Sequence, residues 1–206
     1  MLDQNLPLNK NKGLSFVPKK DKKTLKVLLY GDDGTGKSTF AEKYCKDHQL
    51  HPIVIDIDGT NFTELGENRA VAMNSNNDKT LTRSIINTIK AVHSNEEFDT
   101  IIIDGASSLA DLLCSEARGL AKFSDRATHL KQIIKNLNDY NINVIWVGHD
   151  DFGPVDVQDG KQKSSFCRKI CASVNESYCC TVEKGNFTVE QTKNREPKKT
   201  IEFIEK

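Results

Sequence analysis

The stretch that decides the fold is Gly31-Asp32-Asp33-Gly34-Thr35-Gly36-Lys37-Ser38, which directly follows the apolar run Leu25–Tyr30. Its spacing fits the pattern G-x-x-x-x-G-K-[ST], the Walker A loop that wraps around phosphate. The apolar run predicts a central strand buried on both faces. A helix is predicted to begin near Lys37 and to bury Phe40, Ala41, Tyr44 and Cys45. A strand, a glycine-rich turn and a helix, in this order, form the context in which the motif binds phosphate.

The residue types of this loop suit ATP with Mg²⁺. Glycine lets the backbone wrap closely, so that successive amides point at the phosphates, and the helix N-terminus adds a partial positive charge. Lys37 is expected to reach the β- and γ-phosphates, the Ser38 hydroxyl to bind Mg²⁺, and Thr39 to lie near the α-phosphate. The predicted nucleotide site therefore comprises Gly31, Asp32, Asp33, Gly34, Thr35, Gly36, Lys37, Ser38 and Thr39.

Apolar runs alternate with amphipathic stretches from about residue 25 to residue 150. This alternation is typical of a parallel sheet whose strands are joined by helices. Further along, residues 150–165 predict a loop, Phe166–Ser173 predicts a short helix, and Lys184-Gly185-Asn186 predicts the turn of a hairpin. The strands predicted after the first are Ile53–Ile57, Thr100–Ile103, Asn143–Val147, Tyr178–Glu183, Phe187–Thr192 and Thr200–Ile204.

Polar side chains follow three of these strands. Asp104 ends the strand Thr100–Ile103 in the manner of a Walker B aspartate, which holds Mg²⁺ directly or through water. Hydrolysis also needs a carboxylate that orients or deprotonates the attacking water. Asp58 is our first choice for that role, with Asp56 as the alternative, and a loop-capping aspartate is the ordinary explanation of Asp58. His149 ends the strand Asn143–Val147 and is interpreted as a γ-phosphate sensor or a surface histidine.

The composition sets the limits within which these motifs act. A chain of 206 residues has room for one α/β domain, which we place at 25–206, after a basic, flexible leader at 1–24. The net charge of zero provides no overall attraction to nucleic acid or membrane. The six cysteines contain no C-x₂-C pair, which favours reduced thiols. We see no signal peptide and no membrane-spanning apolar run, so we expect an intracellular protein without membrane partners.

The order of these elements resembles the RecA-like P-loop ATPases. More narrowly, the segments Tyr30–Phe40, Ile53–Asp58, Ile101–Ser107 and Val144–His149 look like those of the small bacteriophage ATPases linked to single-strand annealing and recombination. The resemblance covers roughly residues 25–195. It implies a mainly parallel sheet of order 5-1-4-3-2, counting the predicted strands along the chain, with ATP at its C-terminal edge. It also places Asp58 where the class usually carries a catalytic glutamate, so the shorter side chain implies slow hydrolysis.

The resemblance further implies a homo-oligomer, as a ring or a filament, that acts on single-stranded DNA. Lys193 and Arg195 match a pair that reaches the γ-phosphate of a neighbouring subunit, and an ordinary basic turn is the alternative. Segments 118–126 and 150–165 fall where such proteins carry DNA-binding loops, with Phe152 and Phe166 available to stack on bases. The candidate DNA contacts in these loops are Arg118, Lys122, Arg126, Lys161 and Lys163.

Three functions therefore stay open at the level of the sequence. The first is an ATP hydrolase acting in phage-type DNA recombination or annealing, located in the cytoplasm of the host if a phage encodes it. The second is a small-molecule kinase for nucleosides or nucleotides, with basic residues of 118–126 as its lid. The third is an adaptor that binds ATP without hydrolysing it, which the short Asp58 side chain favours.

Overall fold

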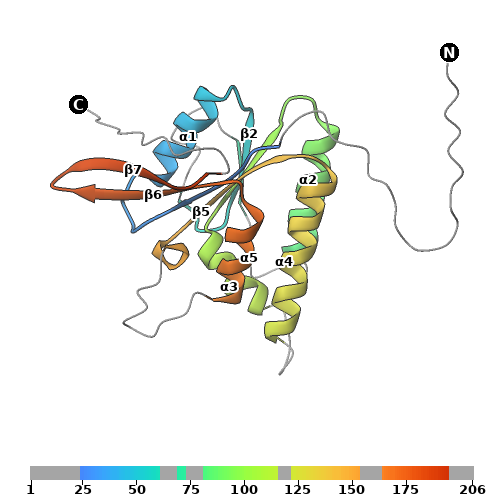
Figure 1. Cartoon of the computed structure of the whole chain (residues 1–206). Coiled ribbons are helices and arrows are strands. Elements are labelled where there is room, and N and C mark those ends of the chain that lie inside the picture. The colour runs from blue at the N-terminus through green and yellow to red at the C-terminus, as the bar shows by residue number, and fades with distance from the viewer. Residues whose placement is uncertain (1–23, 61–68, 73–80, 116–121, 154–163, 195–206) are drawn as a thin grey trace, which may run out of the picture.

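The computed structural model describes residues 24–60, 69–72, 81–115, 122–153 and 164–194. Its centre is a seven-stranded sheet of order β3-β2-β4-β5-β1-β6-β7 (Figure 1). All neighbouring strands pair in parallel except β6 and β7, which form an antiparallel hairpin. The strands are β1 (Lys26–Tyr30), β2 (Pro52–Asp56), β3 (Arg69–Ala72), β4 (Thr100–Asp104), β5 (Asn143–Gly148), β6 (Glu176–Glu183) and β7 (Asn186–Lys193).

This topology confirms the predicted fold class and strand order. The predicted order 5-1-4-3-2 corresponds to β6-β1-β5-β4-β2 in the sheet. The hairpin turn lies at Lys184 and Gly185, whose φ angles of 51° and 80° suit the tight turns that join antiparallel strands. The predicted strand Thr200–Ile204 lies outside the described residues.

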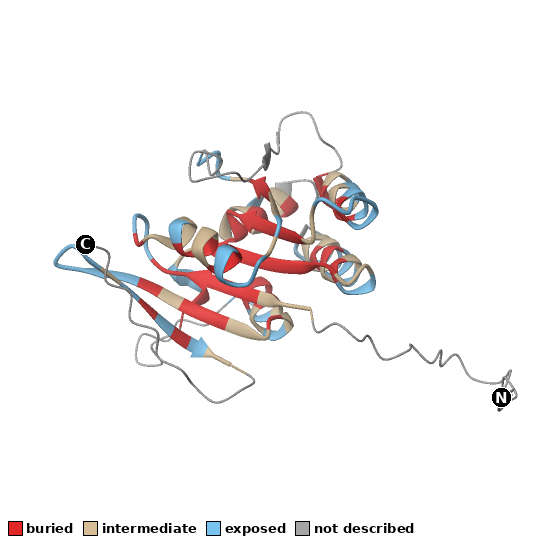
Figure 2. Ribbon diagram, turned by 90° about the horizontal axis from the view of Figure 1, so that it is seen from above, coloured by how far each residue is buried: buried red, intermediate tan, exposed pale blue. Residues whose placement is uncertain are grey.

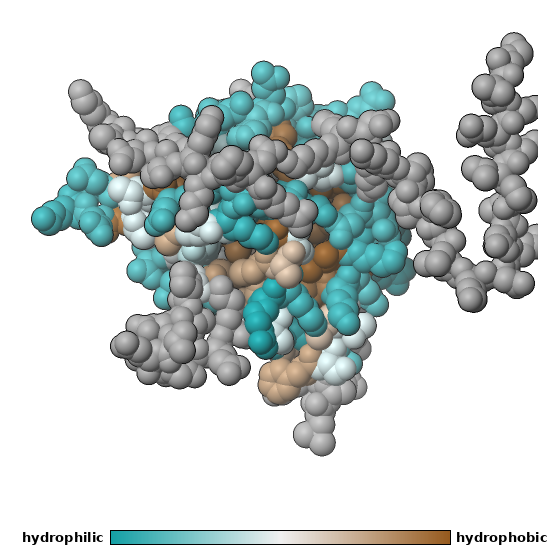
Figure 3. Space-filling model, in the orientation of Figure 1, coloured by the Kyte–Doolittle hydropathy of each residue, from teal (hydrophilic) through white to brown (hydrophobic). Residues whose placement is uncertain are grey.

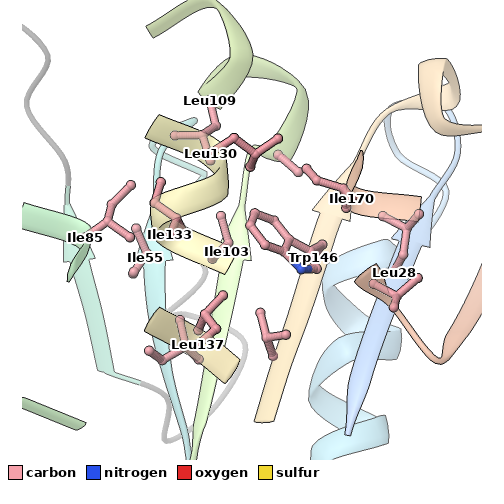
Figure 4. Close-up of a cluster of buried hydrophobic side chains, with 14 of the residues drawn as sticks. Leu28, Ile55, Ile85, Ile103, Leu109, Leu130, Ile133, Leu137, Trp146 and Ile170 are labelled. Atoms are coloured by element: carbon pink, nitrogen blue, oxygen red, sulfur yellow. The ribbon is translucent and has the colours of Figure 1, made fainter. Parts of the chain in front are cut away.

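Helices cover both faces of the sheet, which gives three layers (Figures 1 and 2). Helix α1 packs on the face that carries Val27, Leu29 and Ile145, because alternate residues of a strand point to opposite faces. The other helices pack on the opposite face, around Trp146 and Ile103 (Figure 4). The helices are α1 (Lys37–Asp47), α2 (Leu81–Ser94), α3 (Ala106–Ser115), α4 (Lys122–Asp139) and α5 (Ser165–Ser173).

Two features of the fold differ from the sequence-based expectations. Strand β3 was not predicted, since its sequence Arg-Ala-Val-Ala contains no sustained apolar run and its pairing with β2 defines it. The predicted loop at 150–165 begins instead with a short 3-10 helix, Asp150–Phe152. Phe152 and Phe166 are each only 2% exposed, so both pack in the core and neither is available to stack on a base.

The described helices contain no segment that combines the length and the apolar character needed to cross a bilayer. Apolar side chains instead pack inward, as the buried strands in Figure 2 show. On the face seen in Figure 3, hydrophilic side chains cover much of the described surface and apolar ones are visible between them.

Candidate nucleotide-binding site

The glycine-rich loop joins the C-terminal end of β1 to the first turn of α1. Gly31 begins the loop beside β6, and a Cβ atom at this position would lie 2.1 Å from the carbonyl oxygen of Cys180. Its φ of 150° is also one that residues with a side chain rarely adopt. Only glycine therefore lets the loop leave the sheet at this point.

Lys37 lies over the concave side of this loop. Its Nζ donates hydrogen bonds to the carbonyl oxygens of Gly31 at 3.0 Å and Asp32 at 2.6 Å. The Thr35 hydroxyl also donates to the Asp32 carbonyl, at 2.7 Å. Gly36, with φ of 76°, is the N-cap of α1, so the positive end of that helix points into the same concavity. An ammonium group and a helix N-terminus thus converge where phosphate oxygens would bind.

The carboxylates of β2 and β4 meet at the same edge of the sheet, because Asp56 and Asp104 are paired in register. Asp56 accepts hydrogen bonds from the backbone N–H groups of Gly59, at 2.8 Å, and Thr60, at 3.1 Å. Asp104 accepts one from the Thr60 hydroxyl at 2.6 Å. Asp56 therefore holds the turn after β2, and this turn delivers Thr60 to Asp104.

Burial raises the pKa of Asp104 above its usual range, and the negative charges of Asp56 and Asp58 raise it further. The Thr60 hydrogen bond and the positive charge of Lys37 act in the opposite direction. A buried carboxylate with like-charged neighbours is stabilised in its ionised form by a cation. A cation placed beside Asp104 would therefore favour its ionised form.

Asp58 lies just beyond the end of β2 and packs against Gly105. A Cβ atom on Gly105 would lie 2.7 Å from the Asp58 carboxyl carbon, so the carboxylate rests directly on the residue that follows Asp104. The absence of a side chain at position 105 makes this approach possible. Asp58 and Asp104 therefore face the same space from neighbouring strand ends.

The His149 side chain, which follows the end of β5, contacts the glycine-rich loop. Its Nδ1 lies 3.0 Å from a carboxylate oxygen of Asp33, the third residue of that loop. Its backbone N–H donates to the Ser107 hydroxyl at 3.0 Å, and that hydroxyl donates to Asp151 at 2.8 Å. The Cys167 thiol donates to the same Asp151 side chain at 3.2 Å. A polar chain thus runs from the loop through His149 to helix α5.

One cavity of about 430 Å³ brings these groups together. Its volume lies within the range of sites that bind cofactor-sized ligands. The residues of the glycine-rich loop line one end, and the strand-end side chains line the floor. The full lining in the described chain is Asp33, Gly34, Thr35, Gly36, Lys37, Ser38, Thr39, Phe40, Lys43, Asp58, Thr60, Asp104, His149, Phe187 and Val189.

Comparison with known families agrees with this geometry. A family model described as an AAA domain matches residues 23–174, which is more than half of the chain. The chain belongs to the AAA domain family. The match covers the glycine-rich loop, Asp58, Asp104 and His149, and it indicates a nucleotide-binding domain of the ATPase type. No curated protein matches this AAA domain.

The predicted site residues of the chain fall into four groups. Lys37, Ser38, Asp58, Asp104 and His149 line the cavity, together with the loop residues from Asp33 to Thr39. Gly31 and Asp32 contribute their carbonyl oxygens to Lys37 instead.

Besides Gly31 and Asp32, three predicted residues are described but do not line this cavity, namely Lys122, Arg126 and Lys193. Lys193 donates from Nζ to the carbonyl oxygens of Cys171 and Val174, at 2.6 Å and 2.8 Å, so it binds the C-terminal end of α5. Lys122 and Arg126 belong to the first turns of α4, which corrects their assignment to a loop. The predicted Arg118, Lys161, Lys163 and Arg195 lie outside the described residues.

Sequence reasoning missed several groups that line the cavity of the AAA domain. Thr60 follows Gly59 without any motif, and its role depends on the turn that Asp56 holds. Phe187 and Val189 come from the hairpin, and Lys43 comes from the second turn of α1. Only the apolar alternation of β7 was visible in the sequence, and it gave no indication of which elements lie opposite.

Proposed function

We propose that the chain hydrolyses ATP in a Mg²⁺-dependent reaction, and that this turnover serves DNA recombination or single-strand annealing of the phage type. The observation that carries the first part is the meeting of Asp58, Asp104 and Lys37 in one cavity. This combination provides a cation for the phosphates, a carboxylate for the metal and a second carboxylate for water.

The residues divide the chemistry between them. Lys37 and the amides of the loop would bind the β- and γ-phosphates, while the Ser38 hydroxyl and Asp104 would hold Mg²⁺. The bound ion would offset the negative charge that builds up on the transferred phosphoryl group. Asp58 would accept a proton from the attacking water as its oxygen bonds to the γ-phosphorus. The bond between that phosphorus and the β–γ bridging oxygen breaks, which releases ADP and inorganic phosphate.

His149 is suited to report the state of the γ-phosphate. Its ring pairs with Asp33 in the loop, so a phosphate that competes for the imidazole would release this contact. Because its backbone bonds to Ser107, and Ser107 to Asp151, a shift of His149 would be felt at α5. We propose this polar chain as the route between the nucleotide and the surface formed by α4 and α5.

That surface combines positive charge with an exposed aromatic ring. Phe123 is 60% exposed, and the Arg126 guanidinium carbon lies 5.4 Å from the centre of its ring. The charges of Lys131 and Arg126 add to partial burial in lowering the pKa of Lys169, so three cations gather near this point. Cations that track phosphates, beside a ring on which a base stacks, are the usual parts of a single-strand binding surface. This supports DNA as the partner.

Assembly into a ring or filament is the remaining part of the proposal. The Lys193 side chain bonds within its own subunit to α5. In a homo-oligomer, Lys193 and Arg195 would act on the γ-phosphate of the adjacent subunit only after the ammonium of Lys193 leaves these two carbonyls. ATP-dependent growth of the particle mass would support this part of the proposal.

The decisive experiment measures ATP turnover of the full chain with and without a single-stranded oligonucleotide. Asp58→Asn should retain ATP binding and lose turnover by about 100-fold or more, because the amide cannot accept the proton of water. Asp56→Asn is the matched control, since its amide oxygen can still accept the bonds from Gly59 and Thr60. It should lose far less turnover than Asp58→Asn, because the hydrogen bonds that hold the turn after β2 are kept.

The same assay separates the competing functions. Normal turnover by Asp58→Asn would contradict the assignment of the water-activating group, and phosphate transfer to added nucleosides would identify a kinase instead. ATP binding with no turnover in the wild type would identify an adaptor. Stimulation by the oligonucleotide should fall in Arg126→Gln while basal turnover stays, and a monomeric, unstimulated wild type would contradict the DNA and assembly parts.

A further inference from the structure

The cavity extends past the phosphate-binding loop to a wall that no part of the Walker motifs explains. Phe187 and Val189 of β7 line this part of the cavity together with Phe40 and Lys43 of α1. The wall is built by the hairpin, which lies at one edge of the sheet (Figure 1). A phosphate chain alone would leave these side chains without a ligand group to contact.

Phe187 is held directly beside the loop. Its ring carbon Cδ1 lies 3.1 Å from the position that a Cβ atom on Gly36 would occupy, and Cε1 lies at 3.6 Å. The ring thus contacts the last glycine of the loop, at the N-cap of α1. A ligand whose phosphates bind the loop would pass immediately beneath this ring.

The rest of the wall is anchored in the core. Residues two apart on a strand share a face, so Val189 points to the same side as Phe187. Val189 is buried and packs with Phe40 and Tyr178 in the hydrophobic cluster on the α1 face of the sheet. Because Phe187 itself is only partly buried, its ring combines a fixed position with a surface that a ligand can cover.

The chemistry of the wall suits a flat, aromatic group attached to a polyanion. The apolar ring of Phe187 lines the cavity together with Thr39 and Lys43, which lie on successive turns of α1. The Lys43 ammonium itself lies 3.9 Å from the Asp47 carboxylate. Nucleobases stack on aromatic side chains and carry acceptor atoms on their edges. We propose that Phe187 of the hairpin is the binding platform for the base of the nucleotide, an inference that rests on the proposed function.

The test compares a nucleotide with the bare phosphate chain, which lacks both the ribose and the base. Binding to the full chain is measured by calorimetry for Mg²⁺ with a non-hydrolysable ATP analogue and for Mg²⁺ with inorganic tripolyphosphate. Phe187→Ala should weaken the ATP analogue by about 10- to 100-fold, the range for loss of one base–aromatic stack. The affinity for tripolyphosphate should stay at the wild-type value, and Phe187→Trp should restore the affinity for the analogue.

The matched control is Val182→Ala. Val182 is the cross-strand partner of Phe187 in the hairpin and is 43% exposed, but it is not among the residues that line the cavity. It should leave both affinities unchanged. Equal loss of both ligands in Phe187→Ala would assign the ring a role in shaping the loop and overturn the inference, as would a wild-type affinity for the analogue. If the wild type binds neither ligand, the proposed function itself fails.

Discussion

The cavity is lined at one end by the glycine-rich loop and at the other by the hairpin of β6 and β7, and the sequence specifies these two regions in different ways. At the end that we propose binds phosphate, the lining residues are neighbours in the chain, since Asp33 to Thr39 line the cavity as one continuous segment. At the hairpin end, Phe187 and Val189 meet Phe40 and Lys43 only because β6 pairs with β1. A short continuous motif therefore supplies the loop that we propose binds phosphate. The topology of the sheet brings Phe187 and Val189 to the cavity.

This difference has a consequence for how each end tolerates change. In the proposed function, backbone amides and Lys37 bind the phosphates, so substitutions in the loop would act through its conformation. At the hairpin end, the side chains act through their shape and apolar contact, so substitutions there would change affinity and leave the loop intact. Variants that alter one end of the cavity and leave the other unchanged therefore test whether the two ends act independently.

The largest effect is expected at Gly31, where the two regions touch. In Gly31→Ala the new methyl group would lie 2.1 Å from the carbonyl oxygen of Cys180 on β6, at a φ of 150°. Strain and overpacking together should lower the free energy of unfolding by on the order of 3 kcal/mol. Urea unfolding measures this loss, and nucleotide affinity should fall in parallel. A variant as stable as wild type would show that the loop and the hairpin are independent.

An intermediate effect is expected from Gly105→Ala, which acts on the position of Asp58. The added methyl group would lie 2.7 Å from the Asp58 carboxyl carbon and must displace it. Turnover at saturating ATP should fall by about 10- to 100-fold with little change in KM, because the carboxylate moves away from the water.

Gly185→Ala is the control for this variant. It places a side chain at a similar φ, 80°, where an added Cβ atom meets nothing within 4 Å. It should keep wild-type turnover. If both variants lose turnover equally, backbone strain rather than the position of Asp58 is the cause.

The smallest effect is expected from Asp104→Asn on the stability of the free protein. Burial raises the pKa of this carboxyl in the folded state, so its ionised form is less stable there than in the unfolded chain. The stability linked to its protonated form is complete below the unfolded pKa of about 4 and is lost as pH rises through the folded pKa. The variant should therefore melt higher than wild type near pH 8 without Mg²⁺.

The advantage of Asp104→Asn should shrink as the pH falls. Added Mg²⁺ and ATP analogue should reverse it, because only the wild type then gains the stability of a bound metal ion. Calorimetric melting at several pH values measures both effects. Equal melting temperatures of the variant and the wild type across this pH range would show that folding does not raise the pKa of Asp104.

Much of the fold could be predicted from the sequence because its signals are local. The run before Gly31 and those before Asp104 and Gly148 are apolar enough to indicate buried strands, and the order of the strands follows from the resemblance. Strand β3 could not be predicted, since four residues with one β-branched side chain become a strand only through pairing with β2.

The candidate site also contains some residues that local sequence patterns predict and others that only the folded structure shows. The sequence placed Lys37, Asp58, Asp104 and His149 near one edge of the sheet, because the carboxyl ends of parallel strands meet there. It ranked Asp58 ahead of Asp56, but it could not show that the Asp56 side chain holds the turn after β2, because this depends on the folded turn. The sequence also did not predict that Phe152 is buried. Its side chain is 2% exposed and packs against Gly148, a contact that no local sequence pattern indicates.

The indole of Trp146 gives this chain a built-in optical reporter. It is the single tryptophan of the sequence and lies in the core, 1% exposed, among the side chains drawn in Figure 4. Its fluorescence emission should shift to longer wavelength when unfolding exposes it to water. No second tryptophan contributes to the signal of the natural sequence. The unfolding of the variants that keep Trp146 as their single tryptophan, all those above except Phe187→Trp, can therefore be followed in the unlabelled protein.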